Sequence, residues 1–400
     1  MLGRACRRNL GGWLSVVLLV SATGGLLAIV GERPAAAARR WTVKAEAGPE
    51  YDSNALRVAQ DARSSLVGSP LLRASGDLAF ELGTARHALA LGYSGGAKLF
   101  LREAAAAAHE YVHRATLGTS LHLSPVRIGV QGSYYEVFQP PQDDPALRAL
   151  QRDLRLATGL LRSSSRQHGL WPALVVDLGY QAMHFKPDDD FDFHGPLGSA
   201  SARWGRLAGE GAGASVWTFA ATFTLGRRWF NGLRTVCARA SEGGCFHDLR
   251  ARRADWDQLL WLQLGYEGPA SALWWYGIEL NGSNSDDQRY VRHIVGMRFT
   301  VPLIWSLYAS AESVLQVSNF RRSVALEPTN QPFNPLLDEE NRSRLSAYVG
   351  RELGRRWAVV ARWTVYVNES IAATRALTRL GFFRQTVFAG LRYTFDSELR

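Results

Sequence analysis

The sequence predicts an all-β protein, a transmembrane antiparallel up-and-down β-barrel of about 16 strands with long outer loops and short periplasmic turns. Three observations predict this fold: apolar and polar residues alternate with period two, the alternating segments are long, and the connections between them are alternately long polar loops and tight turns. Soluble strands average about five or six residues, whereas a tilted strand needs roughly 9–11 residues to cross a bilayer. The composition, with 20% charged and 11% aromatic residues and 38 glycines, excludes a disordered chain.

The first 38 residues are typical of a secretory signal. Three arginines precede the apolar residues 13–30, and the small residues Ala36 and Ala38 follow as a cleavage site. We therefore expect residues 1–38 to be a cleaved signal peptide and residues 39–400 to form the barrel in the cell outer membrane; an uncleaved anchor is the alternative. Beyond residue 31 no apolar run reaches the roughly 18–20 residues of a spanning helix, which excludes a polytopic helical membrane protein.

The alternation begins at Trp41 and continues almost to the C-terminus. In residues 41–47 the odd positions are apolar and the even positions polar, and the same pattern recurs in sixteen segments. We expect strands at 41–50, 72–83, 85–96, 110–124, 125–138, 149–163, 170–184, 196–207, 214–229, 257–267, 271–282, 289–301, 305–318, 342–352, 355–369 and 383–395. The long loops fall near 51–71, 97–109, 139–148, 185–195, 230–256, 283–288, 319–341 and 370–382. Since the long loops lie on one rim and the turns on the other, the pattern is typical of outer-membrane barrels.

Aromatic residues of the apolar phase gather in two bands. Those expected near the turns are Trp41, Trp204, Trp217, Tyr266, Trp357, Tyr393 and Phe395, and those expected near the loops are Tyr93, Tyr111, Tyr134, Tyr180 and Tyr276. Bilayer interfaces favour such rings, so the bands predict two aromatic girdles.

The last segment, residues 387–395, alternates without error and ends in Tyr393-x-Phe395. It resembles the terminal strand of bacterial outer-membrane barrels, which implies that Tyr393 and Phe395 form an assembly signal for the barrel-assembly machinery. The architecture resembles a sixteen-stranded porin. Residues 50–54 and 379–395 are also similar to barrels of the surface-lipoprotein assembly modifier group and to polysaccharide-export porins, a resemblance that implies periplasmic export partners.

A barrel of sixteen strands leaves an aqueous interior, so the polar phase predicts which residues line it. The basic candidates are Lys44, Arg114, Arg127, Arg155, Arg203, Arg298, Arg344, Arg362 and Arg392. The acidic candidates are Glu46, Asp77, Glu81, Asp153, Asp177, Glu267, Glu279 and Glu312. Basic residues cluster on the first and the last three strands and acidic ones on strands ten, eleven and thirteen, which predicts a field across the pore that favours polar and zwitterionic solutes. Alternatively, the charges pair with each other and only rigidify the wall.

The cysteines and two further motifs complete the candidate sites. Cys6 lies in the signal, and Cys237 and Cys245 are close enough in sequence to predict a local disulfide, which would stabilise by roughly 2–3 kcal/mol; two free thiols are the alternative. Residues 109–113 match the H-E-x-x-H zinc signature after a run of five alanines, but they lead directly into an alternating segment. The acidic segment 188–192 suggests a calcium site in an outer loop; a solvated acidic loop without bound calcium is the alternative.

No cofactor, metal or catalytic residue is predicted. The sequence lacks a G-x-S-x-G elbow, although an outer-membrane hydrolase stays a minor alternative. Nucleic-acid binding is not expected, because the arginines are scattered along strands. We expect no enzyme but an outer-membrane barrel with an aqueous pore for polar solutes, or the outer exit of a secretion or polysaccharide-export system. The alternative is a structural or partner-binding barrel, or a secretion component, without independent channel activity.

Overall fold

The computed structural model describes residues 38–55, 67–140, 153–186, 189–208, 215–237, 245–320, 343–368 and 382–397. The strands are β1 Ala38–Asp52, β2 Ser69–Gly83, β3 His87–Phe100, β4 Glu110–Leu123, β5 Val126–Phe138, β6 Asp153–Ser165, β7 Ala173–Lys186, β8 Phe193–Ala208, β9 Ser215–Cys237, β10 Cys245–Glu267, β11 Ser271–Ser283, β12 Tyr290–Pro302, β13 Leu307–Phe320, β14 Ser343–Glu352, β15 Trp357–Asn368 and β16 Phe382–Asp396. The predicted signal peptide lies outside the described residues.

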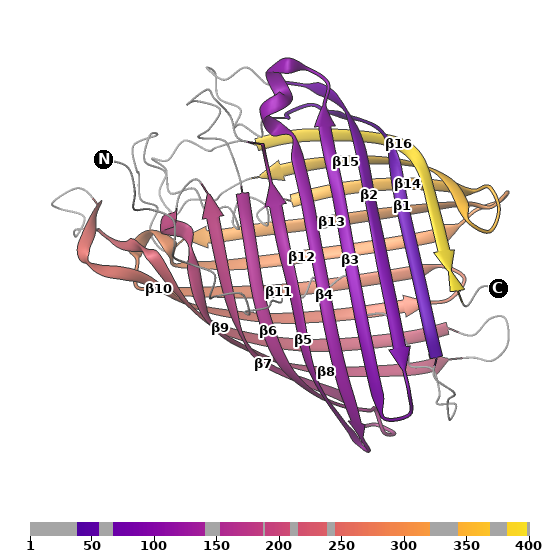
Figure 1. The fold of residues 1–400 in the computed structure, drawn as a ribbon, viewed down its shortest axis with the longest axis horizontal. Coiled ribbons are helices and arrows are strands. Elements are labelled where there is room, and N and C mark those ends of the chain that lie inside the picture. The colour runs from indigo at the N-terminus through magenta and orange to yellow at the C-terminus, as the bar shows by residue number, and fades with distance from the viewer. Residues whose placement is uncertain are drawn as a thin grey trace, which may run out of the picture.

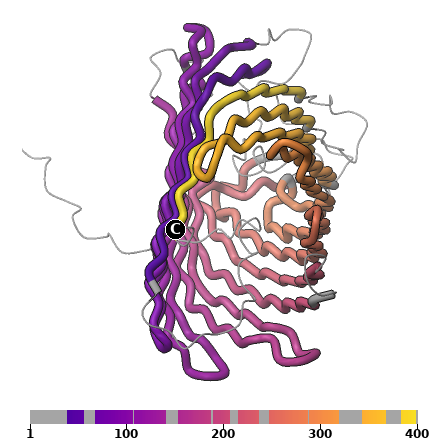
Figure 2. Tube along the Cα trace, turned by 90° about the vertical axis from the view of Figure 1, so that its right-hand side faces the viewer, coloured from indigo at the N-terminus to yellow at the C-terminus, as the bar shows by residue number. Residues whose placement is uncertain are grey.

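These strands form one closed antiparallel barrel. Each strand pairs with its neighbours in sequence, and β1 pairs with β16 to complete the ring. In Figure 1 the indigo-to-magenta strands of the near wall run steeply side by side and the orange strands cross behind them, and the indigo first strand lies beside the yellow last strand (Figure 2). Closure gives every strand a partner on both sides, which is the condition for a sheet to stand in lipid. The predicted fold class is therefore confirmed.

Two rims differ in their connections. The turn rim carries the links β2–β3, β4–β5, β6–β7, β8–β9, β10–β11, β12–β13 and β14–β15, and the loop rim carries the others. In the described part of the loop rim lie the short 3-10 helices η1 Glu103–Ala108, which contains the alanine run, η2 Asp189–Phe191 and η4 Asp286–Gln288. No helix among the described residues is long and apolar enough to span a membrane.

The predicted strand bounds agree with the structure to within four residues, except on one hairpin. The expected loop 230–256 is wrong over most of its length, because β9 and β10 are 23 residues each and stay paired up to Cys237 opposite Cys245. The register shifts between Asp248 and Ala254 mark irregular pairing in this extension. Beyond the bilayer a strand needs no apolar face, so its hydropathy pattern is no longer distinct from that of a polar loop.

Candidate pore lining

Contacts that skip a strand identify the inner face of the barrel. Arg362 on β15 donates to the Glu46 carboxylate on β1 at 2.7 Å, across the intervening β16. Arg392 on β16 donates to the Tyr308 hydroxyl on β13 at 2.5 Å. Side chains converge in this way on the concave face of a curved sheet. Residues that share this face through the period of two and the strand register therefore line the lumen.

The opposite face of the strands is apolar. Large exposed hydrophobic side chains lie on it around the ring, among them Leu78, Leu91, Leu117, Val130, Leu161, Leu178, Phe223, Leu264, Met297, Leu315, Val349, Val359 and Leu391. A continuous exposed apolar band on a closed sheet matches the demands of lipid and not of water. The fold and its two faces thus define an integral membrane β-barrel.

Paired aromatic rings lie on this outer face near both rims. At the turn rim Trp217 contacts Tyr266 at a ring separation of 4.9 Å, and Trp357 contacts Tyr393 at 5.0 Å. At the loop rim Tyr180 and Tyr276 are exposed on β7 and β11. The two bands lie where interfacial girdles are expected.

Fifteen of the seventeen predicted lining residues lie on the lumen face by register. They are Lys44, Glu46, Asp77, Glu81, Arg114, Arg127, Asp177, Arg203, Glu267, Glu279, Arg298, Glu312, Arg344, Arg362 and Arg392. Their part in solute passage stays a prediction.

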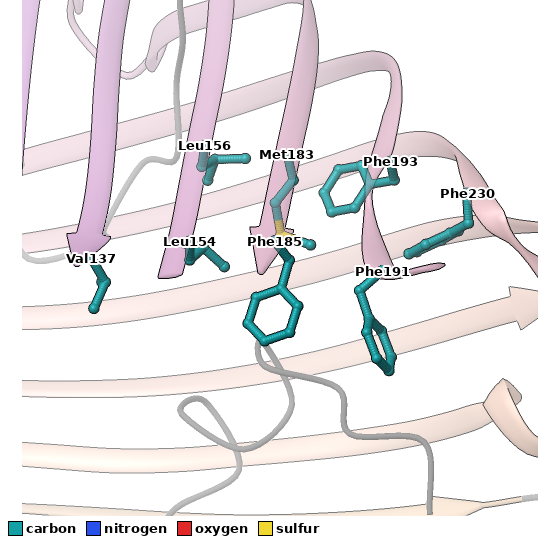
Figure 3. Packing of buried hydrophobic residues seen from close by; sticks show 8 residues of the cluster. All are labelled: Val137, Leu154, Leu156, Met183, Phe185, Phe191, Phe193 and Phe230. Atoms are coloured by element: carbon teal, nitrogen blue, oxygen red, sulfur yellow. The ribbon is translucent and has the colours of Figure 1, made fainter. Parts of the chain in front are cut away.

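Asp153 and Arg155 were placed wrongly. Arg155 is directly opposite Glu136, and both side chains lie on the outer face, joined at 2.8 Å; Asp153 shares that face. The polarity of the two faces is reversed here because the inner side of β5–β9 at the loop rim carries an apolar cluster, shown in Figure 3. Its buried members are Val137, Leu154, Leu156, Met183, Phe185, Phe191, Phe193 and Phe230. Near the rim the rule that polar residues face inward fails.

Seven of the fifteen predicted lumen charges form an ion pair with a neighbouring side chain: Glu46, Asp177, Glu279, Arg298, Glu312, Arg344 and Arg362. Glu312 accepts from Arg298 and Arg344 on the strands on either side. Arg292 donates to Glu279 at 2.9 Å, and Asp177 holds a bidentate pair with Arg162 at 2.7 and 3.0 Å. Pairing cancels the charge of these groups locally, while the predicted field between a basic and an acidic wall stays a prediction.

Arg392 is the exception among the strands β13–β16. Its guanidinium donates to the hydroxyls of Tyr308 at 2.5 Å and Tyr348 at 3.1 Å. In the described part of the chain no carboxylate lies within ion-pair distance of this group. It therefore keeps its positive charge on the lumen wall.

The lumen wall has two unlike halves. In the half next to the loop rim, here the loop-side half, most inner polar side chains are buried against each other, for example Asp52, Asp255, Glu279, Arg292 and Arg384. In the half next to the turn rim, the turn-side half, six charged inner side chains are exposed: Lys44, Asp77, Glu81, Arg127, Arg203 and Glu267. Asp177 and Glu312 in the same half are paired with Arg162 and Arg298. Water thus reaches the six exposed charges directly, while the loop-side charges fill the wall.

Sequence reasoning missed the buried loop-side pairs. The Arg384 guanidinium holds both Asp52 carboxylate oxygens, with Nε at 2.9 Å from each, across the β1–β16 seam. Ser53 bonds to Gln385 in the same place through two bonds, at 2.8 and 2.9 Å. These residues belong to the two segments whose resemblance to known barrels was noted, 50–54 and 379–395. The resemblance of both segments to known barrels was the sequence signal that could have indicated the Asp52–Arg384 pair, because the two segments meet where β1 pairs with β16.

The H-E-x-x-H motif does not form a metal site. His109 precedes β4, and its Nδ1 accepts from the Phe100 N–H at 3.1 Å, while His113 lies on the outer face and bonds to Tyr93 at 2.7 Å. Four residues of extended chain separate the two imidazoles by roughly 13 Å. No group of three or more metal-ligating side chains is present in the residues that the structure describes.

The acidic loop and the cysteines leave two predictions open. Asp188 lies outside the described residues, and Asp192 accepts from the Phe185 N–H at 2.6 Å and contacts the His184 ring at 2.5 Å, which fixes η2. The backbones of Cys237 and Cys245 are opposite each other in register, and their side chains lie outside the described part. Calcium binding and the disulfide stay predictions, as does the assembly role of Tyr393 and Phe395.

Comparisons with known proteins find likeness in structure only. No family model and no curated protein matches the sequence. An anion-selective porin from Comamonas acidovorans is 10% identical, with 90% of this chain and 100% of that chain covered and a TM-score of 0.42. CdiB from Acinetobacter baumannii is 8% identical, with 89% of this chain and 60% of that chain covered and a TM-score of 0.46. Salmonella typhi OmpF in complex with daunomycin is 10% identical, with 88% of this chain and 97% of that chain covered and a TM-score of 0.42. The functional conclusions below rest on the side chains of the barrel itself.

Proposed function

We propose that the chain is an outer-membrane barrel that forms a water-filled pore for small polar solutes. The observation that carries this is the turn-side half of the lumen, where charges of both signs are exposed inside a closed sheet whose outer face is apolar. A wall of mixed charge solvates polar and zwitterionic molecules and disfavours apolar ones. No observation on the described residues favours an export exit or a hydrolase over this reading.

The loop-side half lines the outer part of the proposed path. Buried ion pairs and the apolar cluster of β5–β9 fill its wall, so a solute meets packed side chains there before it reaches the exposed charges. Arg392 offers a guanidinium held by tyrosine hydroxyls rather than by a carboxylate. Anionic groups of a solute are its natural counter-charge.

Single-channel recording tests the proposal. Folded protein in a planar bilayer should give discrete current steps in potassium chloride, and proteoliposomes should swell in glycine or a small sugar. Arg392→Gln should lower the chloride preference by about twofold, since one fixed positive charge leaves the wall. Arg155→Gln, on the outer face, should not change it. A folded, heat-modifiable barrel that gives neither steps nor swelling would overturn the function.

A further inference from the structure

A tyrosine–histidine pair recurs on the outer face at the loop rim. Tyr93 bonds to His113 at 2.7 Å, Tyr180 to His194 at 2.5 Å and Tyr276 to His293 at 2.9 Å. The pairs join β3 to β4, β7 to β8 and β11 to β12, and each histidine lies two residues before the register partner of its tyrosine. The pairs recur on every fourth strand, and each histidine lies within four residues of the loop-rim end of its strand, beside a tyrosine of the loop-rim aromatic band.

The three pairs have different neighbours. His113 is directly opposite Glu136, an acid, and His293 is opposite the apolar Ile278 and Val317. His194 is opposite Trp229, with a ring separation of 5.6 Å. Of the three histidines, only His194 has both an aromatic neighbour on the next strand, Trp229, and a nearby cation.

That cation is Arg227, two residues before Trp229 on the same outer face of β9. Its guanidinium lies over the Trp256 ring at 4.6 Å from the centroid. No carboxylate of the described residues is within ion-pair distance of it, whereas Arg155, the comparable outer-face arginine at this rim, is held by Glu136 at 2.8 Å. Trp229 and Trp256 are 40% and 46% exposed, so the site is open to the membrane.

We propose that Tyr180, His194, Arg227, Trp229 and Trp256 bind the net-anionic, phosphate-bearing headgroup of a lipid of the outer leaflet. A guanidinium matches a phosphate in charge and geometry, and indole rings at this depth pack against the headgroup region. When the Tyr180 hydroxyl donates to Nδ1, the neutral His194 ring carries its proton on Nε2, which is then a second donor for phosphate. The site depends on the membrane placement of the outer face and not on the pore.

Native mass spectrometry of the purified full chain in non-ionic detergent tests this. The probes are diphosphorylated lipid A and, as a zwitterionic control, phosphatidylcholine. The wild-type protein should retain lipid A in preference, and Arg227→Gln should weaken its binding about tenfold, the loss of one charge-assisted contact. His194→Phe should weaken it less. Each variant is first checked for folding by its heat-modifiable migration.

Matched controls make the test decisive. Arg155→Gln and His293→Gln change the same residue types at the same rim and should leave lipid A binding as in the wild type. Equal retention of phosphatidylcholine, unchanged binding by Arg227→Gln, or equal loss in Arg155→Gln would each overturn the site. Single-channel conductance of Arg227→Gln should equal that of the wild type, so failure here and failure of the pore are distinguishable.

Discussion

The loop-side and turn-side halves of the lumen wall use the same residue types in opposite ways. Asp52 and Arg384 in the loop-side half are almost fully buried and hold each other, while Lys44 and Asp77 in the turn-side half are opposite in register and both exposed. A buried charge must be paired, whereas an exposed one is solvated and is free to act on a passing ion. The comparison teaches that a buried, paired charge on the polar face of a barrel strand holds the wall together, whereas an exposed one is accessible to a solute of the proposed pore.

The largest expected effect comes from breaking a buried loop-side pair. Arg384→Ala leaves the Asp52 carboxylate buried without its partner, which should cost about 3–5 kcal/mol of unfolding free energy. Urea unfolding in detergent micelles, followed by tryptophan fluorescence, measures it. The double variant Asp52→Asn with Arg384→Met should recover much of the loss. Lys44→Ala, in the turn-side half, should stay within about 0.5 kcal/mol of wild type, and equal losses in both halves would remove the distinction.

The next effect concerns the β9–β10 hairpin beyond the loop rim. If Cys237 and Cys245 are joined, reduction or Cys237→Ser should destabilise by roughly 2–3 kcal/mol in the chain-entropy model. Intact-mass measurement after thiol alkylation counts free thiols, and thermal unfolding with and without reductant gives the stability. Two alkylated thiols in the untreated protein would rule the bond out.

A smaller effect should sharpen the function of the turn-side half. Lys44→Gln should move the permeability ratio of potassium to chloride towards potassium and Asp77→Asn towards chloride, each by about twofold, because each removes one exposed lumen charge. Reversal potentials under a salt gradient report it. Arg206→Gln, on the outer face at the turn rim, is the control, and an equal shift in that variant would argue against the assigned inner face.

The smallest effect is a pH response at the exposed Asp248 of the hairpin. The Arg250 N–H and the Arg234 guanidinium, which bond to this carboxylate, hold its pKa below the ordinary value of 3.8. Its contribution to hairpin stability is therefore present above that ordinary value and is lost as the pH falls through the lowered pKa. A carboxyl NMR titration measures the pKa, and Arg234→Gln should raise it towards the ordinary value. An unchanged titration in that variant would contradict the contact.

The strands were predictable because lipid imposes one simple rule on the outer face. Period two therefore located all sixteen strands and missed only the loop-rim ends of β9 and β10, which extend past the bilayer where the rule no longer applies. It also misplaced Asp153 and Arg155, since apolar residues take the inner face at that rim. Partners such as Arg298 and Arg344 around Glu312 come from neighbouring strands, and their side-chain geometry depends on register and curvature that hydropathy does not encode.

The seam between β1 and β16 has a consequence for biogenesis. Arg384 reaches an aspartate 332 positions earlier, so the ring is sealed by residues from opposite ends of the polypeptide. A chain that ended before β16 would lack both the sealing arginine and the strand that covers the free edge of β1. Delivery of the whole polypeptide is then a precondition for release into the bilayer, and a truncated product would be left as an open, degradable sheet.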